Sequence, residues 1–182
     1  MSIQPGAHRF GPDNATLRVK TGRRGAAAKA GHDLVIDVTS WQATLDVGDE
    51  EGQIRLELDA DAGSLRVHEG TGGIQPLDDD DKEEIRRTID DQVLEGHPIE
   101  FRSTGVEISD DGRRLRVSGD LEMAGQGHSV DFELSVTSEG QITGGATLKQ
   151  TDWGIKPYSG LFGALKVADE VEVVVKAGPR SN

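Results

Sequence analysis

The sequence contains no cysteine, few aromatic residues and no long apolar run. Without cysteine, the 182-residue chain can form no disulfide, no thiolate nucleophile and no cysteine-ligated metal site. Its apolar runs are far shorter than the ~20 residues that cross a bilayer, which predicts no integral membrane segment. The N-terminal residues lack the basic stretch and apolar core of a secretory signal, so we expect a cytoplasmic protein.

Basic residues are also scarce relative to acidic ones. Asp and Glu number 33 against 20 Lys and Arg, which gives a net charge of -13. Such a surface repels nucleic-acid phosphates and anionic membranes, and this argues against a nucleic-acid partner. The length predicts a single domain over residues 1–182.

Apolar and polar residues alternate along most of the chain, and 24 glycines separate the alternating segments. A period of two is typical of β-strands with one buried face. Two of the segments change phase midway, near Ser40 and after Gly63, which predicts kinked rather than separate strands. With these segments joined, the sequence predicts eight antiparallel strands, arranged as an up-and-down barrel or as a sandwich.

The predicted inward positions include several small residues, which favour a barrel with an internal cavity over a filled core. These small residues are Ala43, Gly119, Gly144 and Ala146. An eight-stranded barrel is just wide enough to be filled by side chains or to hold one small ligand.

One segment has a helical period instead. Ile85, Ile89 and Val93 recur every four residues, which predicts an amphipathic helix over about 81–95. The acidic run that ends at Asp81 offers side-chain caps for the first turn, and Gly96 ends the helix.

Four motifs in order, with a helix before the first of them, resemble the YceI-like family. They are HPIEFRS at 97–103, GDLEMAG at 119–125, TDWGI at 151–155 and ADEVEV at 168–173. A GHD motif at 31–33 is similar to one branch of that family. The resemblance covers about residues 13–177, which it implies are the core of the domain. The resemblance implies an all-β, lipocalin-like barrel of eight antiparallel strands with one helix across its side. It also implies an interior that in some members holds a polyisoprenoid chain.

The resulting hypothesis is a protein that binds, sequesters or transports a long-chain apolar lipid, most simply a polyisoprenoid or an isoprenoid quinone. The bulkiest predicted inward residues form the candidate cavity wall: Trp41, Leu45, Phe101, Met123, Phe132 and Leu134. Aromatic residues of the glycine-containing segment 153–165 form a candidate mouth or lid, although they could equally plug the barrel: Trp153, Tyr158 and Phe162.

The sequence offers little for catalysis or metal binding. Its five histidines lack the close spacing of zinc ligands, and no Gly-x-Ser-x-Gly nucleophile motif is present. We therefore expect no enzyme activity, no metal and no cofactor other than a bound lipid. The alternative is a non-catalytic scaffold or stress-related interaction domain with a filled core, whose acidic helix meets a basic partner. Both hypotheses leave open whether two barrels pair as a homodimer.

Overall fold

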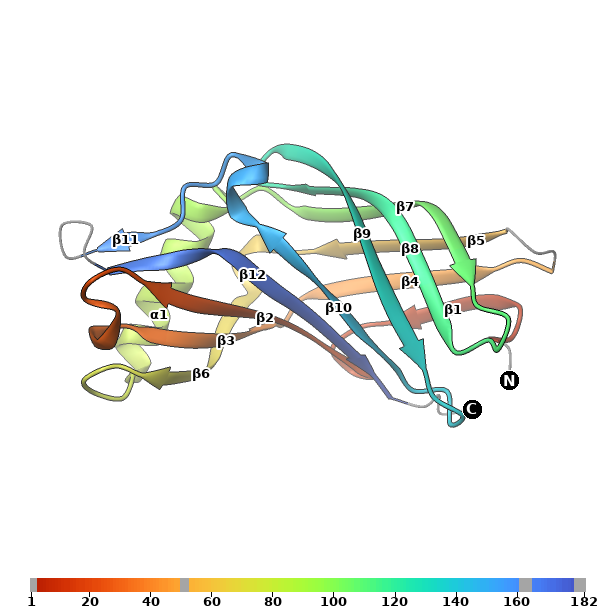
Figure 1. Cartoon of the computed structure of the whole chain (residues 1–182), viewed down its shortest axis with the longest axis horizontal. Helices are drawn as coiled ribbons and strands as arrows, with labels where there is room; N and C mark the ends of the chain where they lie inside the picture. Colours follow the sequence, from red (N-terminus) through yellow and green to blue (C-terminus); the bar gives the residue numbers. More distant parts are fainter. Residues whose placement is uncertain (1–2, 50–52, 161–164, 179–182) are drawn as a thin grey trace.

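The computed structural model describes residues 3–49, 53–160 and 165–178. The described chain is an elongated, strongly curled antiparallel sheet with one main helix near one end (Figure 1). Its strands are β1 (Gly6–Phe10), β2 (Ala15–Arg24), β3 (His32–Val38), β4 (Trp41–Val47), β5 (Ile54–Ala60), β6 (Leu65–Gly72), β7 (Ile99–Ile108), β8 (Arg114–Met123), β9 (Gln126–Val136), β10 (Ile142–Lys149), β11 (Ser159–Gly160) and β12 (Leu165–Ala177).

The sheet curls until strands from opposite ends of the chain meet. Its strand order is β1-β4-β5-β7-β8-β9-β10-β12-β2-β3-β6, with β11 paired to β12. Along the β2–β12 ladder, Val19 lies opposite Val173 and Leu17 lies opposite Val175. The all-β, barrel-like class with one amphipathic helix is therefore confirmed.

The predicted number of eight strands is wrong, because the described residues form 12. Both kinked strands of the prediction are interrupted at the same level of the sheet. There the Thr39 amide donates to the Ser64 carbonyl, and the Asp61 amide donates to the Ser40 carbonyl, each at 3.0 Å. These hydrogen bonds lie outside the regular strand ladders. They separate one predicted strand into β3 and β4 and the other into β5 and β6. The prediction also missed β1 and β11, which are too short to show a clear alternation.

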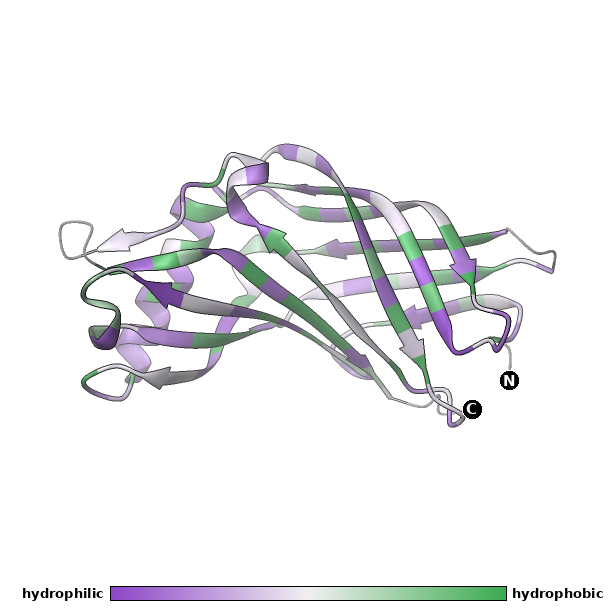
Figure 2. Cartoon of the chain, in the orientation of Figure 1, coloured by the Kyte–Doolittle hydropathy of each residue, from purple (hydrophilic) through white to green (hydrophobic). Residues whose placement is uncertain are grey.

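Hydropathy alternates along the strands as a sheet with one buried face requires (Figure 2). The most deeply buried side chains are Leu45, Leu115 and Val117, each exposed by 1 % or less. Full burial of a side chain of this size contributes about 1.5–3 kcal/mol to stability. These residues fill the sheet interior at β4 and β8 and so support the walls on which the functional site is built.

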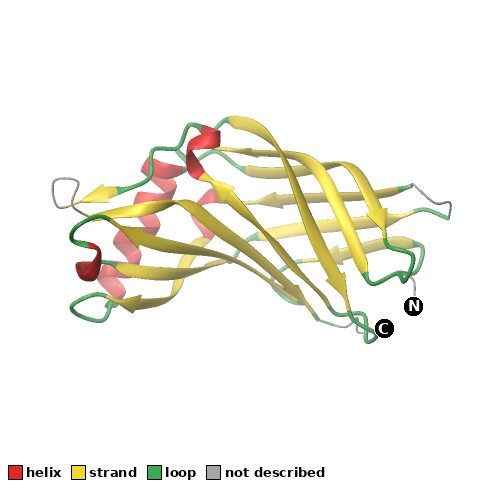
Figure 3. Ribbon diagram, in the orientation of Figure 1, coloured by secondary structure: helices red, strands yellow, loops and turns green. Residues whose placement is uncertain are grey.

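Helix α1 (Asp79–Thr88) continues into a π-helical turn, η3 (Ile89–Val93), and the pair covers one end of the curled sheet (Figure 3). A capping box begins α1: the Asp81 amide donates to the Asp78 carboxylate at 2.8 Å, and the Asp78 amide donates to the Asp81 carboxylate at 3.1 Å. The short 3-10 turns are η1 (Ala28–Ala30), η2 (Ala62–Ser64) and η4 (Gln150–Trp153). Among the described helices, none has the length and apolar character required to cross a bilayer.

Candidate functional site

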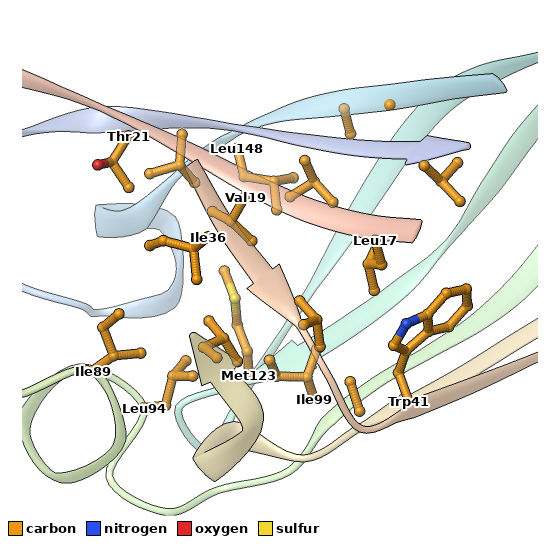
Figure 4. A pocket seen from close by; sticks show the side chains of 18 of the residues that line it. Leu17, Val19, Thr21, Ile36, Trp41, Ile89, Leu94, Ile99, Met123 and Leu148 are labelled. Carbon is orange, nitrogen blue, oxygen red and sulfur yellow. The ribbon is translucent and has the colours of Figure 1, made fainter. Parts of the chain in front are cut away.

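The curled sheet and helix α1 enclose a cavity of about 550 Å³ (Figure 4). Its volume falls within the roughly 300–1,000 Å³ range of small-molecule binding sites. Nearly all of the side chains around it are aliphatic or aromatic. The enclosed space is therefore suited to an apolar ligand.

Strands β2 and β12 show how the local sequence builds the cavity wall. Alternate residues of β2 point inward, and so do alternate residues of β12. The register places these inward residues opposite one another across the ladder. The resulting cross-strand pairs are Leu17–Val175, Val19–Val173 and Thr21–Val171. Their branched side chains pack side by side and form a surface that is apolar except for the Thr21 hydroxyl.

The structure places all six candidate wall residues along the cavity: Trp41, Leu45, Phe101, Met123, Phe132 and Leu134. Phe101 and Phe132 meet edge to face, with ring centroids 5.4 Å apart. Such aromatic pairs have restricted orientations. This part of the wall is consequently an aromatic corner formed by β7 and β9.

The four small residues that suggested a cavity behave in two ways. Ala43 and Ala146 line the cavity, so their short side chains do leave space there. At Gly119, in contrast, a Cβ atom would lie 2.5 Å from the Phe101 ring, and at Gly144 it would lie 2.7 Å from a Leu134 methyl group. The space at these glycines is filled by neighbouring side chains and adds nothing to the cavity.

The three candidate mouth residues are separated in the structure. Tyr158 lines the cavity and is 48 % exposed, so the cavity reaches the surface beside it. Trp153 lies outside the cavity lining and is 2 % exposed; its indole Nε1 donates to the Leu121 carbonyl at 2.8 Å, and its ring packs against His128. Phe162 lies outside the described residues. Trp153 therefore fastens η4 to the sheet rather than covering the opening.

Helix α1 contributes residues to the cavity lining that were not among the six candidate wall residues. Ile85 of α1 and Ile89 of the following η3 turn face the interior, and Leu94 follows them as a buried residue. The sequence contained a signal for these lining residues, because they belong to the apolar face from which the helix was predicted. A surface helix buries such a face against the rest of the fold.

The polar side chains of the lining gather mainly near α1. Asp81, Glu84 and Thr88 come from α1, and Tyr158 comes from the segment before β11. No Lys, Arg or His is present among the described lining residues. Arg23, two residues beyond Thr21 on β2, is not part of the lining, and its guanidinium donates to the Gly31 carbonyl. The opening therefore has an acidic rim.

One residue of the lining carries a buried polar atom without a partner. The indole Nε1 of Trp41 is buried and has no hydrogen-bond partner among the described residues. Trp41 itself is 7 % exposed and belongs to the cavity lining. This unpaired donor is an exception, because more than nine in ten buried polar groups in proteins are paired.

The groups with shifted pKa values lie outside the cavity lining. The Thr151 hydroxyl and amide donate to Asp169 at 2.7 and 2.9 Å, and these hydrogen bonds lower the pKa of that carboxyl. The carboxylate of Asp59 raises the pKa of Arg102. Within the described ranges, no group of three His, Asp or Glu side chains is arranged to hold a metal ion. The chemical character of the cavity is thus apolar, with an acidic rim.

Comparison with known proteins gives a family and a set of similar folds. The family model described as "YceI-like domain" matches residues 13–178. No curated protein matches the chain. Among solved structures, Burkholderia cenocepacia BcnA is similar over 89 % of this chain and 94 % of its own, with 14 % identity and a TM-score of 0.65. The Campylobacter jejuni YCEI protein is similar over 81 % of this chain and 85 % of its own, with 10 % identity and a TM-score of 0.55.

Proposed function

The chain belongs to the YceI-like domain family, and we propose that it binds a long-chain apolar lipid inside its curled sheet. The observation that carries this proposal is the cavity of about 550 Å³ with an almost entirely apolar lining. Burial of apolar surface supplies roughly 25 cal/mol per Å², so several hundred Å² of lipid tail would provide most of the affinity without directional contacts.

Within this class of ligand we propose a polyisoprenoid chain or an isoprenoid quinone. The lining extends from Ile85 on α1, at one end, to Leu45 on β4 and Ile142 on β10. A long flexible chain fills such an elongated space, and Met123 within the wall can adapt to an irregular methyl-branched surface. Selection would then depend on the length and shape of the chain, and the protein would sequester or transport it.

We place the entrance beside α1. Tyr158 and Glu84 are both exposed and both line the cavity, so the opening lies between α1 and the segment that precedes β11. Catalysis requires acid, base or nucleophilic groups that are held at the reacting atoms. The carboxylates of this cavity instead lie at its solvated entrance, which suits a binding protein. We therefore propose a binding role rather than a catalytic one.

Filling the cavity tests this function. The Ala146→Phe variant places an aromatic ring in the lining, whereas Thr147→Phe places the same ring on the outer face of the same strand. We expect Ala146→Phe to weaken the binding of a prenyl quinone at least about tenfold, since the ring takes the space of the ligand. Thr147→Phe should bind as the wild type does. Equal binding by the two variants, both folded by circular dichroism, would contradict the proposal.

The same measurement addresses the scaffold alternative. A folded wild-type protein that binds no prenyl quinone, prenol or fatty alcohol would remove the support for a lipid carrier. The acidic outer face of α1, where Glu83 pairs with Arg86 at 2.8 Å, would then be the surface to test with basic partners.

A further inference from the structure

We propose that the Gln150 carboxamide is a polar subsite of the cavity, and that its Oε1 atom accepts a hydrogen bond from a hydroxyl group of the bound lipid. This inference rests on the proposed lipid-binding function and makes the ligand class narrower. It selects long-chain alcohols, such as prenols, and the reduced, hydroxyl-bearing form of an isoprenoid quinone. Hydrocarbons, ethers and oxidised quinones lack the required donor.

Gln150 lies on the inward face where β10 ends and η4 begins. The inward residues of β10 include Ile142, Ala146 and Leu148, and Gln150 continues this alternation two residues beyond Leu148. All four line the cavity, and Gln150 is only 7 % exposed. The carboxylates, hydroxyl groups and phenol of the lining belong to residues that are half-buried or exposed. Gln150 is therefore a buried amide in an otherwise apolar part of the wall.

One hydrogen bond fixes the orientation of the carboxamide. Its Nε2 atom donates to the Ala168 carbonyl of β12 at 2.9 Å. A backbone carbonyl can only accept a hydrogen bond, so the nitrogen and not the oxygen of the amide must face it. The Gln150 Oε1 atom is consequently held on the side of the amide that points away from this carbonyl.

The Oε1 atom is both unpaired and accessible. No donor from the described ranges reaches it, since the printed bond of this side chain is made by Nε2. The Trp41 Nε1 is likewise unpaired, but its neighbours enclose it completely, whereas the Gln150 Oε1 is not enclosed in this way. Because the Gln150 side chain lines the cavity, its free lone pairs open into that space. A bound ligand therefore meets an acceptor there.

The surroundings of this acceptor require the ligand to bring the donor. Leu148, which Figure 4 shows among the lining side chains, lies opposite Val171 of β12, and both are aliphatic. Water can hydrate the Gln150 Oε1 in the empty cavity, but an apolar chain that displaces this water leaves the oxygen unpaired, which lowers affinity. A hydroxyl group on the chain replaces the lost hydrogen bond.

The place of Gln150 in the fold also orients the lipid. The Val167 amide donates to the Tyr158 carbonyl at 2.9 Å, and Gln150 binds the carbonyl of the next residue, Ala168. The amide therefore lies beside the opening that Tyr158 borders. A lipid whose hydroxyl group binds Gln150 has its polar end at this opening and extends its apolar tail toward Leu45.

Two isomeric probes test the subsite. Hexadecan-1-ol and 1-methoxypentadecane have the same atoms, but only the alcohol carries an O–H donor. The Gln150→Met variant keeps an unbranched side chain and removes the acceptor. We expect the ratio of alcohol affinity to ether affinity to be about fivefold higher in the wild type than in Gln150→Met, as one net hydrogen bond predicts. A purely structural role of Gln150 would change the affinity for both probes equally and leave this ratio unchanged.

A control variant and an NMR signal make the test specific. Gln92→Met makes the same change at an exposed position outside the lining and should keep the wild-type ratio. In the labelled wild type, the alcohol should move the Cδ signal of Gln150 downfield, because its carbonyl then accepts a hydrogen bond. The ether should produce no downfield shift. This measurement decides the question even if Gln150→Met does not fold.

An affinity ratio that is the same in the wild type and in Gln150→Met would overturn the subsite and leave the lipid-binding function intact. The absence of a downfield shift in the wild type saturated with alcohol would also overturn it. If the wild type binds neither probe, the proposed function fails together with this inference.

Discussion

The ring of Phe101 lies over the backbone of Gly119 on the neighbouring strand, and an added Cβ at Gly119 would fall 2.5 Å from the Phe101 Cζ atom. The same Cβ would lie 2.5 Å from the Arg102 carbonyl oxygen, which is part of the β7–β8 ladder. Neither atom can move without disturbing the aromatic contact to Phe132 or the sheet itself. The absence of a side chain at Gly119 therefore allows the Phe101 ring to pack directly on β8.

We predict that Gly119→Ala destabilises the protein by about 1–3 kcal/mol, because overpacking of a close contact costs this amount. Urea unfolding measures the change. The matched control is Gly105→Ala on β7, where the added methyl group meets no atom within 4 Å. The control should match the wild type in stability or slightly exceed it. Equal destabilisation by both variants would show that the Phe101 contact is unimportant.

The capping box at the start of α1 gives a second prediction. Asp78→Ala removes the acceptor of the Asp81 amide, and loss of such a cap costs about 0.5–2 kcal/mol. Because α1 covers one end of the cavity, amide hydrogen exchange in α1 should accelerate before that of the sheet. The control is Asp80→Ala, which removes a carboxylate from the same turn but leaves the capping box intact. Uniform acceleration over the whole chain would contradict a local role for the cap.

The acidic rim predicts discrimination by charge. Glu84→Lys should raise the affinity for a long-chain fatty acid by roughly fivefold, since it replaces repulsion at the entrance by attraction. The affinity for the fatty alcohol of the same length should change little. Glu133→Lys makes the same charge change on the outward face of β9 and should affect neither lipid. Titrations at low salt measure these affinities; an equal gain from both variants would point to overall charge rather than to the rim.

The Asp169 carboxylate links η4 to β12 and gives a prediction for pH. Hydrogen bonds from Thr151 lower the pKa of Asp169 in the folded protein below its unfolded value. The resulting stabilisation is present at pH values above the unfolded pKa of about 3.9. It is lost as the pH falls through the lowered folded pKa. Thr151→Val removes the hydroxyl donor, so its stability deficit should be present at neutral pH and disappear in strong acid. Urea unfolding across this pH range checks the prediction, and a deficit that is the same at every pH would contradict it.

Several elements follow from the sequence because their causes are local. The period of four in Ile85, Ile89 and Val93 predicts the helix and its buried face, and the acidic residues before it supply the cap that the structure contains. Alternation also identifies which side chains of a strand share a face. For this reason, inward residues such as Phe132 and Leu134 could be selected without knowledge of the strand partners.

Other features depend on contacts between distant segments. The break between β3 and β4 is fixed by a hydrogen bond from Thr39 to Ser64, and no local pattern distinguishes it from a bulge. Trp153 was expected at the mouth because it lies in a loop, but the Leu121 carbonyl accepts its indole hydrogen bond and holds it elsewhere. The unpaired indole of Trp41 becomes visible only when every neighbouring acceptor has been placed.

The most direct test of the account is native mass spectrometry of freshly purified protein, before and after extraction with organic solvent. A cavity of about 550 Å³ lined by apolar side chains should retain a ligand during purification. The account predicts a stoichiometric excess mass that extraction removes, and a long-chain apolar lipid in the extract. Protein that carries only its own mass, both as purified and after titration with prenyl quinones, would contradict the account.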